Sequence, residues 1–270
     1  MWKNIYNNQL WDGTLPVKWA GRSLRYFDTL DSTNLEAVRA AKAGACHGTL
    51  IVADRQTDGR GRRGRTWESP AGKNLYFSLI LRPQWSPEKA SMVTLVMANS
   101  VARSIEQQLE YTVTGIKWPN DILLNGKKIC GILTEMCLQQ TNIDYIIVGV
   151  GINVKEQEFE GELFQKASSL NQEGNMDISR EDLLQRIMIA FEEDYELFED
   201  AGDLTPLLSA YQCRLLNKDQ EVIVMDLKSP FEGVAKGITK NGELIVEKTD
   251  QSICHVYAGE VSIRGKQGYI

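Results

Sequence analysis

Four arginines and three glycines gather in the ten residues DGRGRRGRTW, at 58–67. The four cations are Arg60, Arg62, Arg63 and Arg65, and no run of acidic residues balances them. Guanidinium groups bind carboxylates and phosphates through paired hydrogen bonds, while glycines keep an empty loop mobile. Fixing each residue costs about 1–2 kcal/mol, which a multiply charged anion can offset. The segment predicts a loop that becomes ordered over an anion, and a solvated charged turn is the alternative.

Two phosphate-binding patterns also match this loop. The spacing Gly59-x-Gly61-x-x-Gly64 is that of a dinucleotide fingerprint, and the same stretch approaches a P-loop with Arg65 in place of its lysine. Both motifs work only where the loop opens a helix, because the helix N-terminus meets the phosphates. Pro70 follows closely, so no helix is predicted there and neither motif is favoured.

Composition excludes several classes of protein. The 270 residues carry a net charge of −6, which argues against a surface that binds nucleic acid as a whole. Five cysteines without a CxxC pair and only two histidines make a disulfide framework or a metal site unexpected. No basic start precedes an apolar run, and no apolar stretch reaches about 18 residues. A cytoplasmic protein without membrane contact is predicted.

Strands and helices that would position the loop are predicted on both sides of it. Buried strands are predicted at 49–55, 74–83, 114–119 and 144–154. Helices are predicted over 30–44, 86–110 and 179–200. Thr33 and Glu36 have capping-box spacing at the first of these, Gly44 ends it, and Ser86 and Ser179 cap the other two. A hairpin over 121–139 is predicted to turn at Asn125-Gly126.

The pattern changes after about Cys213, where short strands alternate with glycines and polar turns. This texture is typical of a small β-barrel joined to a larger α+β body. We therefore predict one domain over 1–212, with 1–20 as an N-terminal extension, and a second over 213–270.

Five segments resemble the biotin protein ligases in order and spacing. They are DSTN (31–34), GRGRRGRTW (59–67), KWPND (117–121), GKKICGIL (126–133) and GVGIN (149–153). The resemblance extends over 24–265. It implies an α+β fold with a mixed-sheet catalytic domain, similar to class II aminoacyl-tRNA synthetases, and a C-terminal SH3-like β-barrel.

The reaction implied by this resemblance has two steps. The carboxylate of biotin attacks the α-phosphorus of ATP, which gives biotinyl-5′-AMP and pyrophosphate. A lysine ε-amine of a biotin carboxyl carrier protein then attacks the mixed anhydride and releases AMP. Biotin and ATP are therefore the implied substrates, and Mg²⁺ is expected to arrive with ATP without an assigned protein ligand.

The resemblance also implies roles for individual residues. Arg62, Lys128 and Asp121 correspond to catalytic positions. Biotin contacts are implied for Ser32, Thr33, Asn34, Gln56, Gly59, Arg60, Arg62, Lys128 and Gly131. ATP contacts are implied for Arg60, Arg62, Arg63, Arg65, Trp67, Asn120, Lys128, Ile152 and Asn153. Glu135 lies in the same region and is interpreted as structural.

Other functions stay open beside this one. Bifunctional members of the family carry an N-terminal winged helix of about 60 residues, whereas about 20 residues precede the ligase region here, so no repressor function is expected. The oligomeric state stays open between a monomer and a homodimer, because family members dimerise through sheet edges but a single sequence shows no interface. The alternatives are a lipoate protein ligase, a nucleic-acid-binding regulator that uses the arginine loop, and a relic that only binds biotin.

Overall fold

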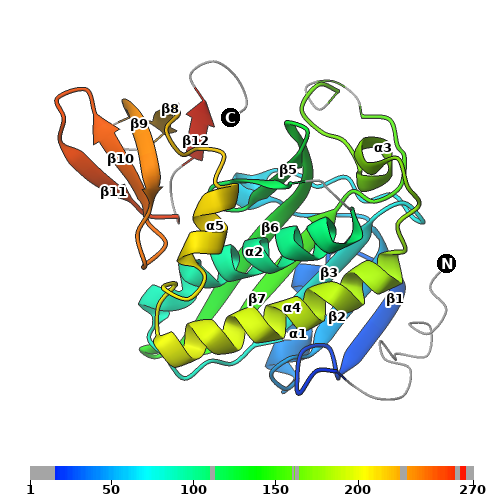
Figure 1. The fold of residues 1–270 in the computed structure, drawn as a ribbon. Helices are drawn as coiled ribbons and strands as arrows, with labels where there is room; N and C mark the ends of the chain where they lie inside the picture. The colour runs from blue at the N-terminus through cyan, green and yellow to red at the C-terminus, as the bar shows by residue number, and fades with distance from the viewer. Residues whose placement is uncertain are drawn as a thin grey trace.

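The main body of the protein is a seven-stranded mixed sheet. The computed structural model describes residues 16–109, 113–159, 161, 164–225, 230–258 and 262–265. The strand order is β1-β2-β3-β7-β6-β5-β4, with β1 parallel to β2 and all other neighbours antiparallel (Figure 1). The strands are β1 (Leu24–Leu30), β2 (Leu50–Gln56), β3 (Leu75–Leu81), β4 (Gly115–Lys117), β5 (Asp121–Leu124), β6 (Lys127–Gln139) and β7 (Asn142–Ile152).

Helices cover both faces of this sheet. Two long helices, α2 (Ala90–Gln108) and α4 (Arg180–Ala201), pack against each other on one face (Figure 1). The opposite face is covered by α1 (Thr33–Lys42), which packs on β2, β3 and β7. Shorter elements are η2 (Arg62–Gly64), η3 (Pro87–Lys89), α3 (Leu170–Gly174) and α5 (Leu208–Arg214). None of the helices in the described ranges is long and apolar enough to cross a membrane.

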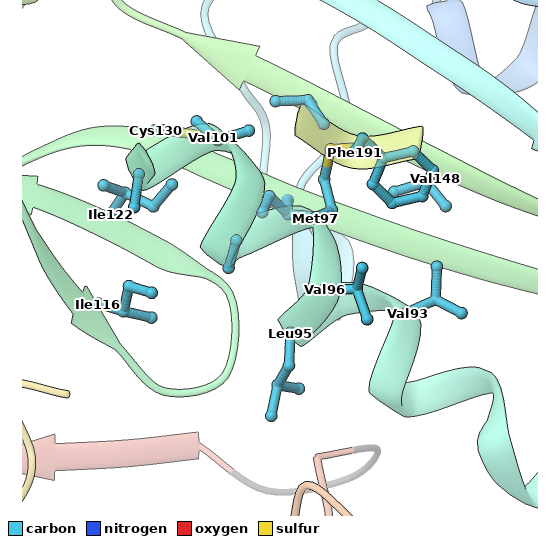
Figure 2. Packing of buried hydrophobic residues seen from close by; sticks show 14 of the residues in the cluster. Val93, Leu95, Val96, Met97, Val101, Ile116, Ile122, Cys130, Val148 and Phe191 are labelled. Carbon is cyan, nitrogen blue, oxygen red and sulfur yellow. The ribbon is translucent and has the colours of Figure 1, made fainter. Parts of the chain in front are cut away.

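The strand register sorts residues between the two faces. Ile116, Ile122, Cys130, Ile152 and Leu75 are aligned across β4, β5, β6, β7 and β3, and all are buried in the core under α2 and α4. Figure 2 shows the side chains of Ile116, Ile122 and Cys130 near α2. Successive residues of a strand point to opposite faces. The neighbouring row therefore faces α1.

That neighbouring row is chemically different. It consists of Lys117, Asp121, Gly131, Gly151 and Tyr76, which are aligned across the same five strands. Two charges and two glycines thus lie on the α1 face, one residue away from the apolar row. The sheet itself therefore directs the functional residues to that face.

A second, five-stranded sheet forms the C-terminal part of the chain. Its order is β11-β10-β9-β8-β12, and all neighbours are antiparallel. The strands are β8 (Glu221–Met225), β9 (Phe231–Ile238), β10 (Leu244–Lys248), β11 (Ile253–Val256) and β12 (Ser262–Gly265). The predicted fold class, an α+β body with a small C-terminal β unit, is confirmed. The boundary between 212 and 213 stays a prediction, as does the extension over 1–20, most of which lies outside the described residues.

Local signals predicted some elements correctly. Asn125 and Gly126 both have positive φ, at 50° and 78°, as the predicted hairpin requires. Ser179 caps α4 by accepting a hydrogen bond from the backbone N–H of Asp182. The helix predicted over 86–110 begins instead with the short η3 after Ser86. β1, α3 and α5 were not predicted.

The predicted capping box of α1 is wrong. Ser32 rather than Thr33 is the N-cap, and its side chain makes no capping hydrogen bond. The Thr33 hydroxyl instead contacts Gln56 on β2 and Ser78 on β3. Gly44 follows the end of the helix with φ 87°, as predicted. The Thr33 side chain, which the local pattern assigned to the helix N-terminus, thus forms tertiary hydrogen bonds instead of capping the helix.

Candidate active site

A pocket on the α1 face brings together most of the predicted site residues. It lies between the start of α1, the arginine loop and strands β6 and β7, and encloses about 460 Å³ that is partly open to solvent. Of the predicted residues, its lining includes Ser32, Thr33, Asn34, Gln56, Arg60, Arg62, Trp67, Asn120, Lys128 and Gly131. A concave site with convergent polar groups is typical of the binding sites of small organic ligands.

Three glycines make room for the pocket floor. A Cβ on Gly149 would lie 1.9 Å from Asn34 Oδ1, and a Cβ on Gly151 would lie 2.5 Å from Trp67 Nε1. A Cβ on Gly131 would lie 2.9 Å from the Trp67 ring. Because any side chain here would displace Asn34 or Trp67, the glycines of GVGIN and GKKICGIL serve close approach.

One end of the pocket is lined by neutral polar groups. The backbone N–H of Thr33 donates to Gln56 Oε1 at 2.8 Å, and Gln56 Nε2 donates to Ser69 Oγ at 2.8 Å. Ser69 Oγ in turn donates to the carbonyl of Trp67 at 2.9 Å. Ser32 and Thr33 are only 2% and 4% exposed. These groups are rigidly held and suit a neutral polar ring of a ligand.

The other end of the pocket is cationic. Lys128 Nζ lies 2.7 Å from Asp121 Oδ1 and 5.3 Å from the centre of the Trp67 ring. Arg62 donates to Asn120 Oδ1 at 2.8 Å and to the carbonyl of Ala258 at 2.6 Å. Burial lowers the pKa of Arg62. An arginine held this way remains charged and is placed to meet an anion.

The arginine loop forms a compact turn. Trp67 N–H donates to Gly59 O at 2.8 Å, and Gly61 N–H donates to Arg65 O at 2.7 Å. A Cβ on Gly59 would lie 2.2 Å from Trp67 O, so this close pairing requires glycine. Only the three-residue η2 occurs in the loop, and Arg63 within it has φ 60°. The loop opens no α-helix, which excludes both the dinucleotide and the P-loop interpretations.

Six of the predicted residues do not line this pocket. Gly59 and Asp121 contact the lining residues Trp67 and Lys128, and the other four lie further away. Arg63 lines a neighbouring groove beside α2, and Arg65 is exposed and lines neither cavity. Asn153 is 5% exposed and donates from Nδ2 to Ser168 O at 3.0 Å. The Ile152 side chain is fully buried in the core under α2. Their suggested contacts with a nucleotide stay predictions.

The structure also adds residues that sequence reasoning missed. Ser78 and Glu135 contact Asn34, although Glu135 was interpreted as structural. Lys117 is 7% exposed on β4, and its pKa is lowered to about 8 by burial and by the nearby cations. The sequence could have indicated Lys117, because it lies within an apolar strand and buried lysines are rare unless they are paired or functional.

Metal-binding groups are not concentrated in the part of the chain that the structure describes. Within it, no three His, Cys, Asp or Glu side chains are grouped as a metal site would need. All five cysteines are free thiols, and Cys46 and Cys213 are exposed.

Comparisons with known proteins point to one family. The family model described as "Biotin/lipoate A/B protein ligase family" matches residues 26–153, and that of the "Biotin protein ligase C terminal domain" matches 219–264. The chain is 39% identical to the bifunctional ligase/repressor BirA of Bacillus subtilis, over 92% of this chain and 76% of that protein. It is 31% identical to the biotin--[acetyl-CoA-carboxylase] ligase of Paracoccus denitrificans, over 80% of this chain and 90% of that one.

Solved structures agree with these similarities. The biotin protein ligase of Aquifex aeolicus in complex with biotin and ATP superposes with a TM-score of 0.78 and 30% identity. The match covers 90% of this chain and 99% of that one.

Proposed function

The chain belongs to the biotin/lipoate A/B protein ligase family, and from this premise we propose that it is a biotin protein ligase. The observation that carries the proposal is the pocket with two unlike ends. Neutral polar groups around Thr33 and Gln56 lie at one end, and Arg62 and Lys128 lie at the other. Biotin has the same division, with a neutral ureido ring and a terminal carboxylate.

The polar end suits the ureido ring. This ring offers two N–H donors and one carbonyl acceptor, so it needs both acceptors and donors from the protein. We propose that Ser32, Thr33, Asn34 and Gln56 provide them. Gly59 and Gly131, where a side chain would collide with Trp67, contribute their backbones to the proposed biotin contacts. Because the polar groups are fixed by their own hydrogen bonds, little entropy is lost when the ligand binds.

The cationic end suits the adenylation step. The biotin carboxylate forms a bond to the α-phosphorus of ATP, and pyrophosphate leaves with the electrons of the broken P–O bond. Two unit charges at 4 Å repel by ~1 kcal/mol in water and by ~4 kcal/mol at an effective dielectric near 20. Arg62 and Lys128 are placed to reduce this repulsion, because fixed cations stabilise charge as it develops. We propose that Arg60, which is in the same loop, joins them.

The second step needs an amine at the same place. A lysine ε-amine attacks the carbonyl carbon of biotinyl-5′-AMP, AMP leaves, and the nitrogen loses a proton. Asp121 lies 2.7 Å from the Lys128 ammonium, so its carboxylate already holds one cationic amine at this end of the pocket. We propose that Asp121 orients the incoming amine, in its neutral nucleophilic form, by accepting a hydrogen bond from its N–H.

The proposed nucleotide contacts lie both inside and outside the pocket. Trp67 offers its ring for the adenine, and Asn120 and Asn153 offer amide groups. Arg63, Arg65 and Ile152 complete the proposed ATP contacts, and Mg²⁺ would arrive with the phosphates. The hydrogen bond from Arg62 to Ala258 joins the loop to the C-terminal unit, which we propose to be a separate SH3-like domain over 213–270, after a catalytic domain over 1–212.

The proposed acceptor is a lysine of a biotin carboxyl carrier domain. A cytoplasmic location and the absence of nucleic-acid binding stay predictions from the sequence, which leaves monomer or homodimer open. Lipoate carries a dithiolane ring without N–H or carbonyl groups, so the polar end of the pocket favours biotin over lipoate as the acid.

Pyrophosphate exchange with ATP tests the proposal. The exchange is measured with the purified chain, Mg²⁺ and ATP, with biotin and lipoate supplied separately. Exchange that depends on biotin supports the proposal. Exchange with lipoate alone would assign the chain to the other branch of the family, and exchange with neither acid would overturn adenylation.

A further inference from the structure

Glu135 lies on the α1 face of β6 and contacts the buried amide of Asn34. Glu135 Oε2 accepts a hydrogen bond from Asn34 Nδ2 at 2.7 Å, and Leu133 O accepts a second from the same nitrogen at 3.3 Å. Asn34 is 3% exposed and lies over Gly149. A carboxylate only accepts hydrogen bonds, so it fixes which end of the Asn34 amide faces it. The amide oxygen must therefore point the other way.

That oxygen begins a chain of hydrogen bonds into the pocket. Ser78 Oγ lies 2.6 Å from Asn34 Oδ1 and 2.8 Å from Thr33 Oγ1, and Ser78 is fully buried. A hydroxyl has one proton, and an amide oxygen can only accept. The Ser78 proton therefore goes to Asn34. The Thr33 hydroxyl lies 2.8 Å from Ser78 Oγ and 3.2 Å from Gln56 Oε1. If its proton went to Gln56, the shorter contact with Ser78 would join two lone pairs, so Thr33 donates to Ser78.

This order of donors decides what Thr33 offers to a ligand. Once its proton points to Ser78, the exposed side of Thr33 Oγ1 consists of lone pairs. We infer that Glu135 is a positioning residue that sets the direction of this chain, and thereby makes Thr33 an acceptor for an N–H of the ligand. The inference rests on the proposed function, since the ureido ring supplies such an N–H and a dithiolane ring does not. Glu135 is thus a determinant of acid specificity.

A charged acceptor is needed for a unique direction. A neutral glutamine at 135 would present either its oxygen or its NH₂ to Asn34, so the amide of Asn34 could turn over and reverse the chain. Charge-assisted hydrogen bonds are roughly twice as strong as neutral ones. The bond to Leu133 O supports the native orientation but is longer, so a partial loss of ligand affinity is expected.

Glu135 has a second neighbour, which the test must separate from the chain. Arg60 NH1 lies 3.9 Å from Glu135 Oε1. Through this contact Glu135 would act on the arginine loop instead of on Thr33. The two routes differ in one respect, because only the route through Asn34 passes through the Ser78 hydroxyl.

Steady-state pyrophosphate exchange with E135Q, S78A and the double variant tests the inference. E135Q should raise the KM for biotin about fivefold to tenfold and leave kcat and the KM for ATP within about twofold. In the S78A background the same substitution should change the KM for biotin by less than about twofold. E36Q is the matched control, because Glu36 is a carboxylate on α1 that pairs with Arg39 and does not line the pocket.

The outcomes separate two failures. Wild-type enzyme without biotin-dependent exchange would overturn the proposed function together with this inference. Wild-type exchange with an unchanged KM in E135Q, or an equal effect of E135Q with and without Ser78, would overturn the inference alone. Thermal unfolding of each variant shows whether the pocket is intact, and a fall in kcat with an unchanged KM would also count against a positioning role.

Discussion

The two faces of the seven-stranded sheet differ at the pocket, although their residues alternate along the same strands. On the α2/α4 face, the row through Ile122, Cys130 and Ile152 is buried and apolar. On the α1 face, the adjacent row places Gly131 and Gly151 in the pocket lining and Asp121 beside Lys128. Elsewhere on the α1 face, a smaller apolar cluster that includes Ile51, Ile80 and Ile147 packs under α1. Adjacent residues of one strand thus belong to different faces, one packed under α2 and α4 and the other lining the region of the pocket.

The difference shows how one sheet supports both stability and catalysis. Apolar burial contributes about 25 cal/mol per Å² and is concentrated on the face that α2 and α4 cover. The α1 face gives up part of this contribution, since glycines occupy positions where a large side chain could have packed. If this division holds, substitutions on the two faces should change different measured quantities.

Lys128→Ala should have the largest effect on activity. Its ammonium lies at the cationic end, so removing it should lower kcat for pyrophosphate exchange by roughly 10²–10³-fold. Direct titration should still detect biotin binding, and the free energy of unfolding should change little. Lys127→Ala is the matched control, since Lys127 pairs with Glu173 at 3.0 Å outside the pocket lining. Near-wild-type exchange in Lys128→Ala would contradict the role of this lysine.

Arg62→Gly should release the intermediate. The guanidinium joins Asn120 and the carbonyl of Ala258, so its loss frees the loop from both sheets. Hydrogen bonds to charged groups are worth about 1.5–3 kcal/mol, which predicts roughly 10–100-fold faster escape of biotinyl-5′-AMP. Trapping the released intermediate with hydroxylamine measures this. The escape rate in Arg62→Lys should lie between those of wild type and Arg62→Gly, because lysine keeps the charge but lacks the paired N–H donors of the guanidinium. Equal retention in Arg62→Gly and wild type would contradict the prediction.

Sequence reasoning succeeded where the signal was local. The Asn125-Gly126 turn, the Ser179 cap and the glycine after α1 each depend on a few neighbouring residues. The resemblance to biotin ligases located ten residues that line the pocket.

Reasoning from sequence failed where partners lie far apart in the chain. Thr33 forms a hydrogen bond with Ser78, 45 residues away, whereas local spacing predicts a helix cap for Thr33. Asn34 forms a hydrogen bond with Glu135, 101 residues away, so the sequence alone predicts only a structural role for Glu135. Burial of Lys117 likewise depends on the packing of distant elements around a three-residue strand. These contacts arise only when the sheet is assembled.

Gly149→Ala and Val148→Ala compare the two faces at adjacent positions of β7. A Cβ at 149 would displace Asn34, so the KM for biotin should rise about tenfold or more while stability changes less. Val148 is fully buried in the core, and its truncation should lower the free energy of unfolding by ~2 kcal/mol with an unchanged KM. Urea unfolding and exchange kinetics on both variants test the contrast. The same response from both would show that the faces are not functionally separate.

Lys117 provides the smallest and most specific test, because it brings a buried charge to the α1 face. Burial, opposed by Asp121, lowers its pKa in the folded chain to about 8, from 10.5 ordinarily. Below pH 8 both states carry the proton, and folding bears the full cost of burying the charge. Between pH 8 and 10.5 the folded chain has lost the proton while the unfolded chain retains it. Stability should therefore rise with pH, by at most ~1.4 kcal/mol per unit.

The comparison with Lys117→Met isolates this contribution from every other titrating group. Methionine keeps the length of the side chain and removes the charge, so the variant lacks the pH-dependent cost. The free energy of unfolding of wild type minus that of the variant, measured in urea at pH 7, 8, 9 and 10, should be constant up to about pH 8 and then increase. A difference that stays flat would mean that Lys117 remains protonated in the folded chain. The charge of Asp121, opposite Lys117 in the sheet, would then outweigh the cost of burial.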